Sequence, residues 1–375
     1  MRTLVDYRPA LRSRTGVGEY VHELTRALIR TRRDSPTDPE TLSLFSSSWA
    51  DRLDPGVVPG AETIDARWPV RVLNYTWHRW EWPPIETVTG RSFDVVQSMH
   101  PLLIPARRAA QVVTIHDLDF LDHPERTTAE IRRDYAALAS AHAKRADRVI
   151  AVSKFTAGEI ERRLGVSAAQ IDICSPGAPD WSPRAQEPRE GYTLFLGSLE
   201  PRKNLGVLLD AYAQLTAQRT SLPRLVLAGR AGEGSAEWIA RTQAAPLAGL
   251  VDLPGYVAPD ARQSLMAGAV ALVMPSLMEG FGIPALEAMA LGVPVIVSNR
   301  GALPEVVGDA GLLFDPLDPA ALAAALARVF SEPALRHEMT SRGIARAAYY
   351  SWNRTANRTR EAWDAAIEAR QARRG

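Results

Sequence analysis

The chain is 375 residues long, more than one hydrophobic core usually supports, and therefore predicts two domains. Its composition, 46% hydrophobic and 23% charged, is typical of soluble globular proteins, and a net charge of +1 argues against a nucleic-acid binder. A single cysteine, Cys174, excludes an internal disulfide and any cysteine-based metal cluster.

Short β-branched runs alternate with longer amphipathic stretches, which is the pattern of parallel sheets with crossover helices. In the first half, the predicted strands are residues 3–6, 41–46, 94–98, 111–116 and 148–153. Helical spacing predicts helices over 18–31 and 128–145, and Ser153 is expected to cap a further helix that runs through Leu164.

The second half repeats this scheme, with predicted strands at 193–198, 224–229, 251–256, 271–276 and 294–298. Several of them end in Gly or Ser before a helix, where a parallel sheet presents backbone N–H groups to ligands. The Pro- and Gly-rich segment 175–191 is interpreted as an interdomain linker. The pattern predicts an α/β protein with two Rossmann-like domains, 1–180 and 192–351, and a ligand in the cleft between them.

The stretch "EGFGIPALE" places two carboxylates, Glu279 and Glu287, eight residues apart. Pro284 favours a helix that begins near 284, which would put Glu287 in the first turn and Glu279 in the preceding loop. One carboxylate could accept two vicinal hydroxyls, as on a ribose, and the other a second polyol, with a phosphate between them. In the alternative, Glu287 only complements the helix dipole and Glu279 is solvated.

A second motif is "FLGSLEPRKNL", in which a strand ends at Gly197 and the following loop carries Arg202 and Lys203. Two cations at a strand-to-helix turn can neutralise a diphosphate and stabilise it as a leaving group. Lys203 is one of only three lysines among 44 basic residues, which suggests that its compact charge is needed. In the alternative, both side chains are solvated loop cations.

Two further motifs lie in the first half. Gly16 opens a helix after the first strand as a weak dinucleotide fingerprint, because the third glycine is missing. His116 follows a strand end that is expected to face the cleft, although a lone histidine is more often structural. The Asp-x-Asp of residues 117–119 receives little weight as a metal site.

Together and in this order, "TGVGEY", "HD", "GSLEPRKNL" and "PSLMEGFGIPALEAMALGVPVI" resemble the retaining glycosyltransferases of family four, over about residues 3 to 315. The resemblance implies the GT-B fold, with two facing Rossmann-like domains and a final helix, 352–375, that crosses back onto the first. It implies transfer of a hexose from a nucleoside diphosphate sugar to an acceptor hydroxyl, with retention of configuration. It implies neither a cofactor nor a metal ion.

The resemblance also assigns roles to residues. It implies a catalytic set of Glu279, His116, Arg202 and Lys203, and a donor-binding set of Glu287, Gly16, Gly197, Tyr256, Val257, Gly280, Phe281 and Gly282. Glu287 would hold the ribose, the two cations the diphosphate, and Glu279 with the 280–282 amides the transferred sugar. His116 would contact that sugar from the first domain, Gly16 would pack near the diphosphate, and residues 256–257 would meet the nucleobase.

The donor and acceptor are less well defined by the sequence. "HDLDFLDHPE" looks most like the mannosyltransferase branch and favours GDP-mannose, with UDP-glucose or another hexose donor as the competitor. Residues 67–84 concentrate Trp68, Trp77, Trp80 and Trp82, which could stack on a glycan, rest at a membrane interface beside a lipid-linked acceptor, or simply pack. A nucleotide-sugar epimerase of the same fold and a non-catalytic nucleotide-sugar binding protein are the alternative functions.

The start of the chain lacks the unbroken apolar core of a signal peptide. No later stretch reaches the roughly 18 apolar residues that a membrane helix needs. We therefore expect a cytoplasmic protein, with peripheral association at the inner membrane face as a further expectation.

Overall fold

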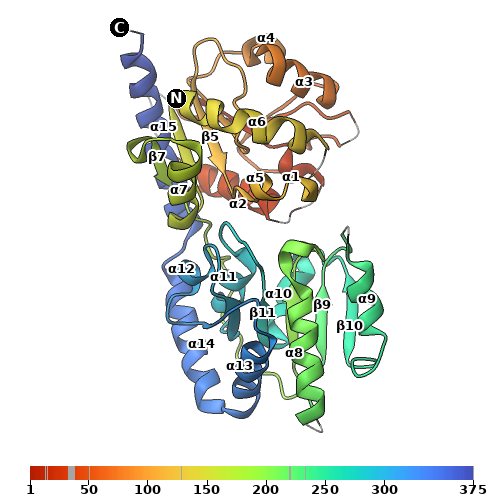
Figure 1. Cartoon of the computed structure of the whole chain (residues 1–375). Coiled ribbons are helices and arrows are strands. Elements are labelled where there is room, and N and C mark those ends of the chain that lie inside the picture. Colours follow the sequence, from red (N-terminus) through yellow and green to blue (C-terminus); the bar gives the residue numbers. More distant parts are fainter. Residues whose placement is uncertain are drawn as a thin grey trace. The chain divides into compact units, whose positions relative to one another are not determined.

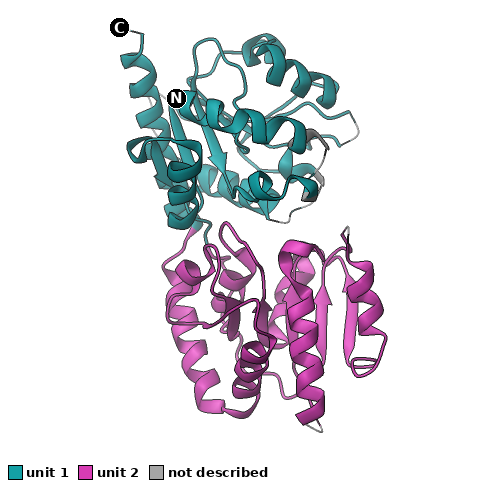
Figure 2. Cartoon of the chain, viewed as in Figure 1, with its two compact units in different colours: residues 1–177, 352–375 teal, residues 178–351 magenta. Residues whose placement is uncertain are grey.

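The chain divides into two compact units in the computed structural model (Figure 2). Unit 1 comprises Met1–Gly177 and Trp352–Gly375, and unit 2 comprises Ala178–Ser351. The structure describes residues 1–12, 14, 16–32, 39–49, 51–127, 129–218, 221–232 and 234–374. Within the stretch interpreted as a linker, residues 178–191 belong to unit 2.

Unit 1 contains a seven-stranded parallel sheet in the order β3-β2-β1-β4-β5-β6-β7. Its strands are β1 (Arg2–Asp6), β2 (Thr41–Ser46), β3 (Glu62–Asp65), β4 (Val95–Ser98), β5 (Ala110–Ile115), β6 (Arg148–Ala151) and β7 (Ile171–Ile173). Its helices are α1 (Pro9–Arg12), α2 (Val17–Arg30), α3 (Val70–Trp80), α4 (Ile85–Thr89), α5 (Asp119–Asp122), α6 (Ala129–Arg145), α7 (Lys154–Glu159) and α15 (Trp352–Ala372). Figure 1 shows these helices around the sheet.

Two buried clusters form much of the core of unit 1. One packs α6 against β5 and β6, and the other packs α3, through Leu73 and Trp77, against β1, β2 and β4. The predicted cap of α7 is confirmed, because the Ser153 hydroxyl accepts a hydrogen bond from the backbone N–H of Thr156 at 3.0 Å. The helix then continues as one π-helical turn, Ile160–Leu164.

Helix α15 returns to unit 1 after the whole of unit 2 and packs on α2, β5 and β6. Its Trp363 is fully buried and donates a hydrogen bond from Nε1 to Gln97 Oε1 at 2.8 Å. Its Arg360, also buried, places Nε 3.0 Å from both carboxylate oxygens of Glu40. A charged pair out of water needs such complete pairing, so the helix is an integral part of the core of unit 1.

Unit 2 contains a six-stranded parallel sheet in the order β10-β9-β8-β11-β12-β13. Its strands are β8 (Tyr192–Leu196), β9 (Leu225–Ala228), β10 (Val251–Gly255), β11 (Ala269–Met274), β12 (Val295–Ser298) and β13 (Leu312–Phe314). Its helices are α8 (Leu205–Gln218), α9 (Ala236–Thr242), α10 (Pro259–Ala267), α11 (Ile283–Ala290), α12 (Leu303–Val307), α13 (Pro319–Ser331) and α14 (Pro333–Ala348). Because all strands are parallel, the loops that follow them gather at one edge of the sheet.

Candidate active site

Glu279, in the loop that follows β11, lies at the centre of a charged cluster in unit 2. Lys203 Nζ is 2.6 Å from Glu279 Oε1, and Arg202 Nη1 is 3.1 Å from Oε2. The Ser276 hydroxyl donates a further hydrogen bond to Oε1 at 2.7 Å. The carboxylate is buried. The interpretation of Glu279 as a solvated side chain is therefore wrong, and the two cations are ordered by the carboxylate between them.

The cluster keeps Glu279 ionised. Burial raises the pKa of Glu279, but the charges of Lys203 and Arg202 and the hydrogen bonds from Lys203 and Ser276 outweigh it and lower the pKa to about 2. Two cations then share one carboxylate, so the group keeps a net positive charge. A diphosphate complements such a group, because its oxygens accept the same charge-assisted hydrogen bonds.

Hydrogen bonds to backbone carbonyls hold the Arg202–Lys203 loop and the loop after β11 together. The N–H of Leu277 donates to the carbonyl of Arg202 at 2.9 Å, and the Asn204 side-chain amide donates to the carbonyl of Pro275 at 3.2 Å. Gly301, with a φ of 61°, packs against Glu279 so closely that a Cβ there would lie 2.5 Å from the Glu279 carbonyl oxygen. The charged side chains are therefore held in place before any ligand arrives.

The loop of residues 280–282, which contains two glycines, leads directly into α11. Gly282 precedes the helix with a φ of 112°, and a Cβ there would lie 2.6 Å from Leu303. Phe281 anchors the loop, since its buried ring packs edge-on against Tyr350 at 5.5 Å. One expectation is corrected: α11 begins at Ile283, so Glu287 is its fifth residue and belongs to the second turn. At that depth, packing and pairing rather than the helix dipole decide the environment of Glu287.

Glu287 is 3% exposed and forms an ion pair with Arg262 of α10, with Arg262 Nη1 2.7 Å from Glu287 Oε1. The guanidinium is nearly as buried as the carboxylate. Sequence reasoning missed Arg262, because it occurs in a polar helical stretch without any motif. It also missed Ser276, whose only indication in the sequence was that a predicted strand ends at this polar residue.

The remaining predicted donor residues of unit 2 follow two other strands of its sheet, β10 and β8. Tyr256 and Val257 follow β10, and the exposed ring of Tyr256 carries the guanidinium of Arg230 4.5 Å above its centre. Gly197 follows β8, and a Cβ there would lie 3.7 Å from Lys203 Cε. At that distance the Cβ would make an ordinary van der Waals contact with the Lys203 side chain.

The two predicted residues of unit 1 are connected by Tyr20. Gly16 stands at the start of α2, where its carbonyl accepts from the Tyr20 N–H at 3.1 Å, and the Tyr20 ring lies edge-on to His116 at 5.0 Å. Burial lowers the pKa of His116 to about 4, against a backbone hydrogen bond with Met99 that raises it. The imidazole is therefore neutral at pH 7, and within the described part of the chain its Nε2 has no hydrogen-bond partner.

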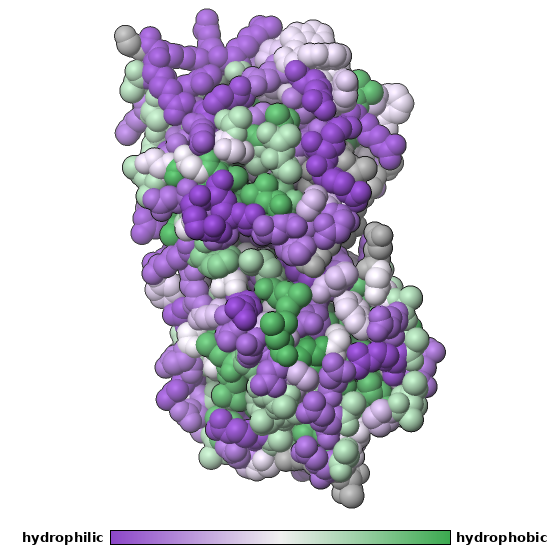
Figure 3. Space-filling view, in the orientation of Figure 1, coloured by the Kyte–Doolittle hydropathy of each residue, from purple (hydrophilic) through white to green (hydrophobic). Residues whose placement is uncertain are grey.

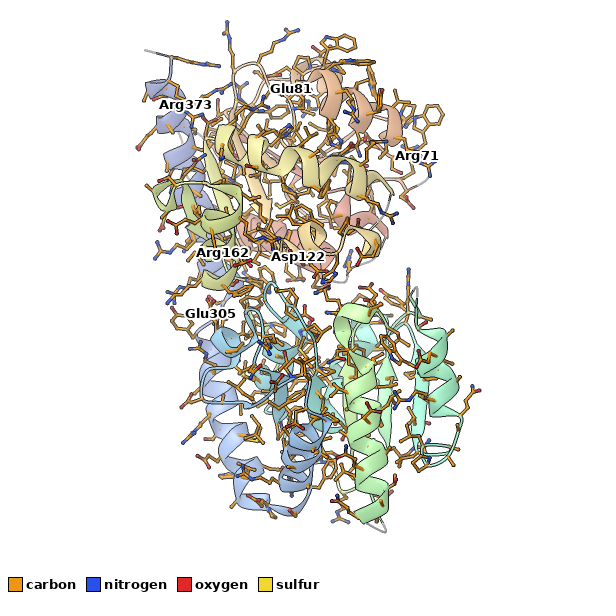
Figure 4. All side chains as sticks on the ribbon, in the orientation of Figure 1. Arg71, Glu81, Asp122, Arg162, Glu305 and Arg373 are labelled. Carbon is orange, nitrogen blue, oxygen red and sulfur yellow. The ribbon has the colours of Figure 1, made fainter. Side chains whose placement is uncertain are left out.

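The tryptophan-rich segment divides into packed and exposed residues. Trp77 is buried and donates from Nε1 to the Pro83 carbonyl at 2.8 Å. Trp68, Trp80 and Trp82 are 36%, 65% and 59% exposed. Arg71 projects from α3 (Figure 4), and the surface over α3 and α4 mixes pale side chains of intermediate hydropathy with hydrophilic ones (Figure 3). Ordinary packing thus explains only one of the four tryptophans.

Neither a membrane-spanning helix nor a metal centre is found in the described residues. None of the helices there is long and apolar enough to cross a bilayer. No group of three or more His, Cys, Asp or Glu side chains in the same ranges is arranged to hold a metal ion. The Asp-x-Asp pair instead shapes the start of α5, where the Asp117 carboxylate accepts from the Asp119 N–H at 3.2 Å.

Two family models match successive parts of the chain. The model described as Glycosyltransferase Family 4 matches residues 14–180, and the one described as Glycosyl transferases group 1 matches residues 180–346. The O-antigen chain mannosyltransferase B of Escherichia coli is 34% identical over 273 residues, which is 69% of this chain and 71% of that protein. The D-inositol 3-phosphate glycosyltransferase of Rhodococcus opacus is 32% identical over 56% of this chain and 51% of its own length.

Solved structures share the fold at lower identity. Sucrose-phosphate synthase from Thermosynechococcus elongatus matches with a TM-score of 0.72 at 20% identity, covering 96% of this chain and 97% of its own. WaaG, a glycosyltransferase involved in lipopolysaccharide biosynthesis, matches with a TM-score of 0.72 at 16% identity over 96% and 98% of the two chains. The chain therefore belongs to the family-four glycosyltransferases and has their GT-B fold.

Proposed function

We propose that the protein transfers a hexose, with mannose favoured, from a nucleoside diphosphate sugar to a hydroxyl of a glycan or lipid-linked acceptor, with retention of configuration. The observation that carries this proposal is the cluster of Arg202 and Lys203 around the buried carboxylate of Glu279. It lies where parallel strands end, and it has the charge to bind a diphosphate.

The proposed reaction breaks the bond between the anomeric carbon and the diphosphate and forms a bond to the acceptor oxygen on the same face. Negative charge grows on the leaving diphosphate, and Arg202 and Lys203 stabilise it. The departing phosphate oxygen takes the acceptor proton, so a separate protein base is not required. Glu279 and the backbone amides of 280–282 orient the sugar, while Glu287 holds the ribose.

GDP-mannose is the favoured donor. The mannosyltransferase relative at 34% identity and the "HDLDFLDHPE" stretch support it. A thermal-shift screen against GDP, UDP, ADP and their hexose conjugates tests the choice, because a ligand that binds only the native state raises Tm. A selective shift with GDP-mannose supports the proposal. A shift with UDP-sugars alone would discard mannose, and no shift with any nucleotide would contradict the site itself.

Product analysis separates this proposal from the alternative functions. Incubation with the donor and a mixture of acceptors should yield a glycosylated acceptor and free nucleoside diphosphate, whereas an epimerase would release a free sugar without an acceptor. A non-catalytic binding protein would shift in Tm and form neither product. NMR of the anomeric proton in the product tests retention.

We propose that no metal ion is required, since Arg202 and Lys203 can neutralise the diphosphate themselves. Saturating EDTA is expected to leave the rate unchanged. Loss of activity that Mg²⁺ or Mn²⁺ restores would contradict this part of the proposal.

The exposed aromatic side chains around α3 are the proposed contact with the acceptor or its membrane. Trp80, Trp82 and the nearby Arg79 are all exposed, so large amphipathic rings and positive charge occur in the same short segment. Such a surface suits the headgroup region of an anionic bilayer. Co-sedimentation with phosphatidylglycerol vesicles at low salt tests it. Absence of the protein from the pellet would exclude membrane binding and leave direct stacking on a glycan.

A further inference from the structure

Arg262 is the side chain that meets Glu287, the carboxylate to which the proposed function gives the ribose. It is 8% exposed, and its Nη1 lies 2.7 Å from Glu287 Oε1. The two residues come from different helices, since Arg262 is on α10 and Glu287 on α11. α10 begins at Pro259, two residues beyond the Tyr256–Val257 segment proposed to meet the nucleobase.

Burial of this ion pair carries a desolvation cost, which the contact between the two charges must offset. A glutamate that is 3% exposed loses most of its hydration, and a lone charge at such a position would be strongly destabilising. Arg262 compensates with a charge-assisted hydrogen bond from its Nη1 to Glu287 Oε1, which holds that carboxylate oxygen in place. The ion pair of Arg224 with Asp252 in the same unit is, by contrast, about half exposed.

We infer that Arg262 is a positioning residue, which orients the Glu287 carboxylate so that it accepts hydrogen bonds from both vicinal hydroxyls of the donor ribose. This inference rests on the proposed function, which assigns the ribose to Glu287. Because α10 directly follows the segment at the base, Arg262 also fixes the ribose carboxylate relative to the nucleobase. The specificity it confers is for ribonucleotides over deoxyribonucleotides.

The inference predicts a loss of discrimination rather than a uniform loss of affinity. A hydrogen bond to a charged group is worth about 1.5–3 kcal/mol, or roughly 10- to 150-fold in Kd. The wild-type protein should therefore bind GDP or UDP at least about tenfold more tightly than the matching 2′-deoxy or 3′-deoxy nucleotide. Arg262→Met should weaken the ribonucleotide by that factor, change the deoxynucleotides little, and reduce the ratio to less than about threefold.

Calorimetric titration of purified protein with GDP, UDP and their 2′-deoxy and 3′-deoxy forms provides the test. Arg262→Lys should restore part of the discrimination, since an ammonium keeps the positive charge but not the planar guanidinium that places Nη1. If Arg262→Met does not fold, Arg262→Lys provides the test by itself. Its ratio of deoxyribonucleotide Kd to ribonucleotide Kd must then lie between one and the wild-type value. Arg224→Met is the matched control, which removes an arginine ion pair of the same unit and should leave the ratio unchanged.

The outcomes separate this inference from the function on which it rests. If the wild type binds no nucleotide, the proposed function itself fails. If the wild type prefers ribonucleotides and the Arg262 variants keep the same preference, Arg262 is not a positioning residue. A parallel weakening of ribo- and deoxynucleotides would mark a merely structural role and would also overturn the inference. A collapse of the ratio, together with non-additive effects of Arg262→Met and Glu287→Gln, would support it.

Discussion

Replacing Glu279 with glutamine should change nucleotide affinity and turnover in opposite directions. In the protein without donor, the Glu279 carboxylate forms ion pairs with both cations of the proposed diphosphate site. Its Oε1 lies 2.6 Å from Lys203 Nζ, and its Oε2 lies 3.1 Å from Arg202 Nη1. An incoming diphosphate must share or replace these contacts, and it meets a fixed negative charge. Glutamine removes that charge at nearly constant shape, so free nucleoside diphosphate should bind more tightly to the variant.

The magnitude follows from the strength of the existing contacts. The fall in the pKa of Glu279 from 4.5 to about 2 corresponds to roughly 3 kcal/mol in favour of the charged carboxylate. If diphosphate binding forfeits about half of this, Glu279→Gln lowers Kd on the order of tenfold. Turnover should fall by about 10²-fold, because the variant loses a preorganised contact to the transferred sugar.

Calorimetric titration with GDP and with UDP at pH 7 and low salt measures the affinity, and initial rates with the active donor measure turnover. Glu200→Gln is the control, because it removes one negative charge from the Arg202–Lys203 loop and leaves the Glu279 contacts in place. An unchanged or higher Kd for both nucleotides in folded Glu279→Gln would refute the reasoning. If Glu200→Gln lowered the Kd of the nucleotides by a similar factor, the effect of Glu279→Gln would be explained by net charge alone.

Three further predictions follow from the same structure. Lys203→Ala should reduce the rate by roughly 10²-fold or more, as expected for loss of one preorganised cation, and near wild-type turnover would exclude that role. Arg360→Met removes the buried guanidinium that pairs with Glu40 and should lower the free energy of unfolding by about 3–5 kcal/mol in urea titrations; a loss below about 1 kcal/mol would contradict a structural role for this ion pair. Because the pKa of Glu279 is lowered by folding, its charge stabilises the protein above about pH 4.5 and the contribution is lost as pH falls toward 2, so the Tm difference between wild type and Glu279→Gln should shrink over that range.

The central strands were predictable because strands of a parallel sheet that are buried on both faces need continuous apolar runs. The strands at 41–46 and 271–276, for example, correspond to Thr41–Ser46 and Ala269–Met274. Sequence reasoning missed β3, β7 and β13, each of which lies at the edge of its sheet. With three or four residues and only partial burial, these strands carry too short a pattern to be recognised.

The candidate site was predictable in its parts but not in its pairing. Residue types and loop positions identified Glu279 and Lys203 separately, yet nothing in the sequence shows that residues 76 positions apart will share a hydrogen bond. Their contact follows from the strand order, because β8 and β11 are neighbours and their loops emerge side by side. Arg262 could not be found, since only the packing of α10 against its surroundings distinguishes it from an ordinary surface arginine.

The discontinuity of unit 1 has a consequence for biosynthesis. All of unit 2 emerges from the ribosome before α15, whose Trp363 and Arg360 fill the core of unit 1. N-terminal domains usually fold first during translation. Here, the core of unit 2 can be completed before the core of unit 1. Nascent unit 1 must keep an incomplete hydrophobic surface while unit 2 is translated, and this interval is when a chaperone would be needed most.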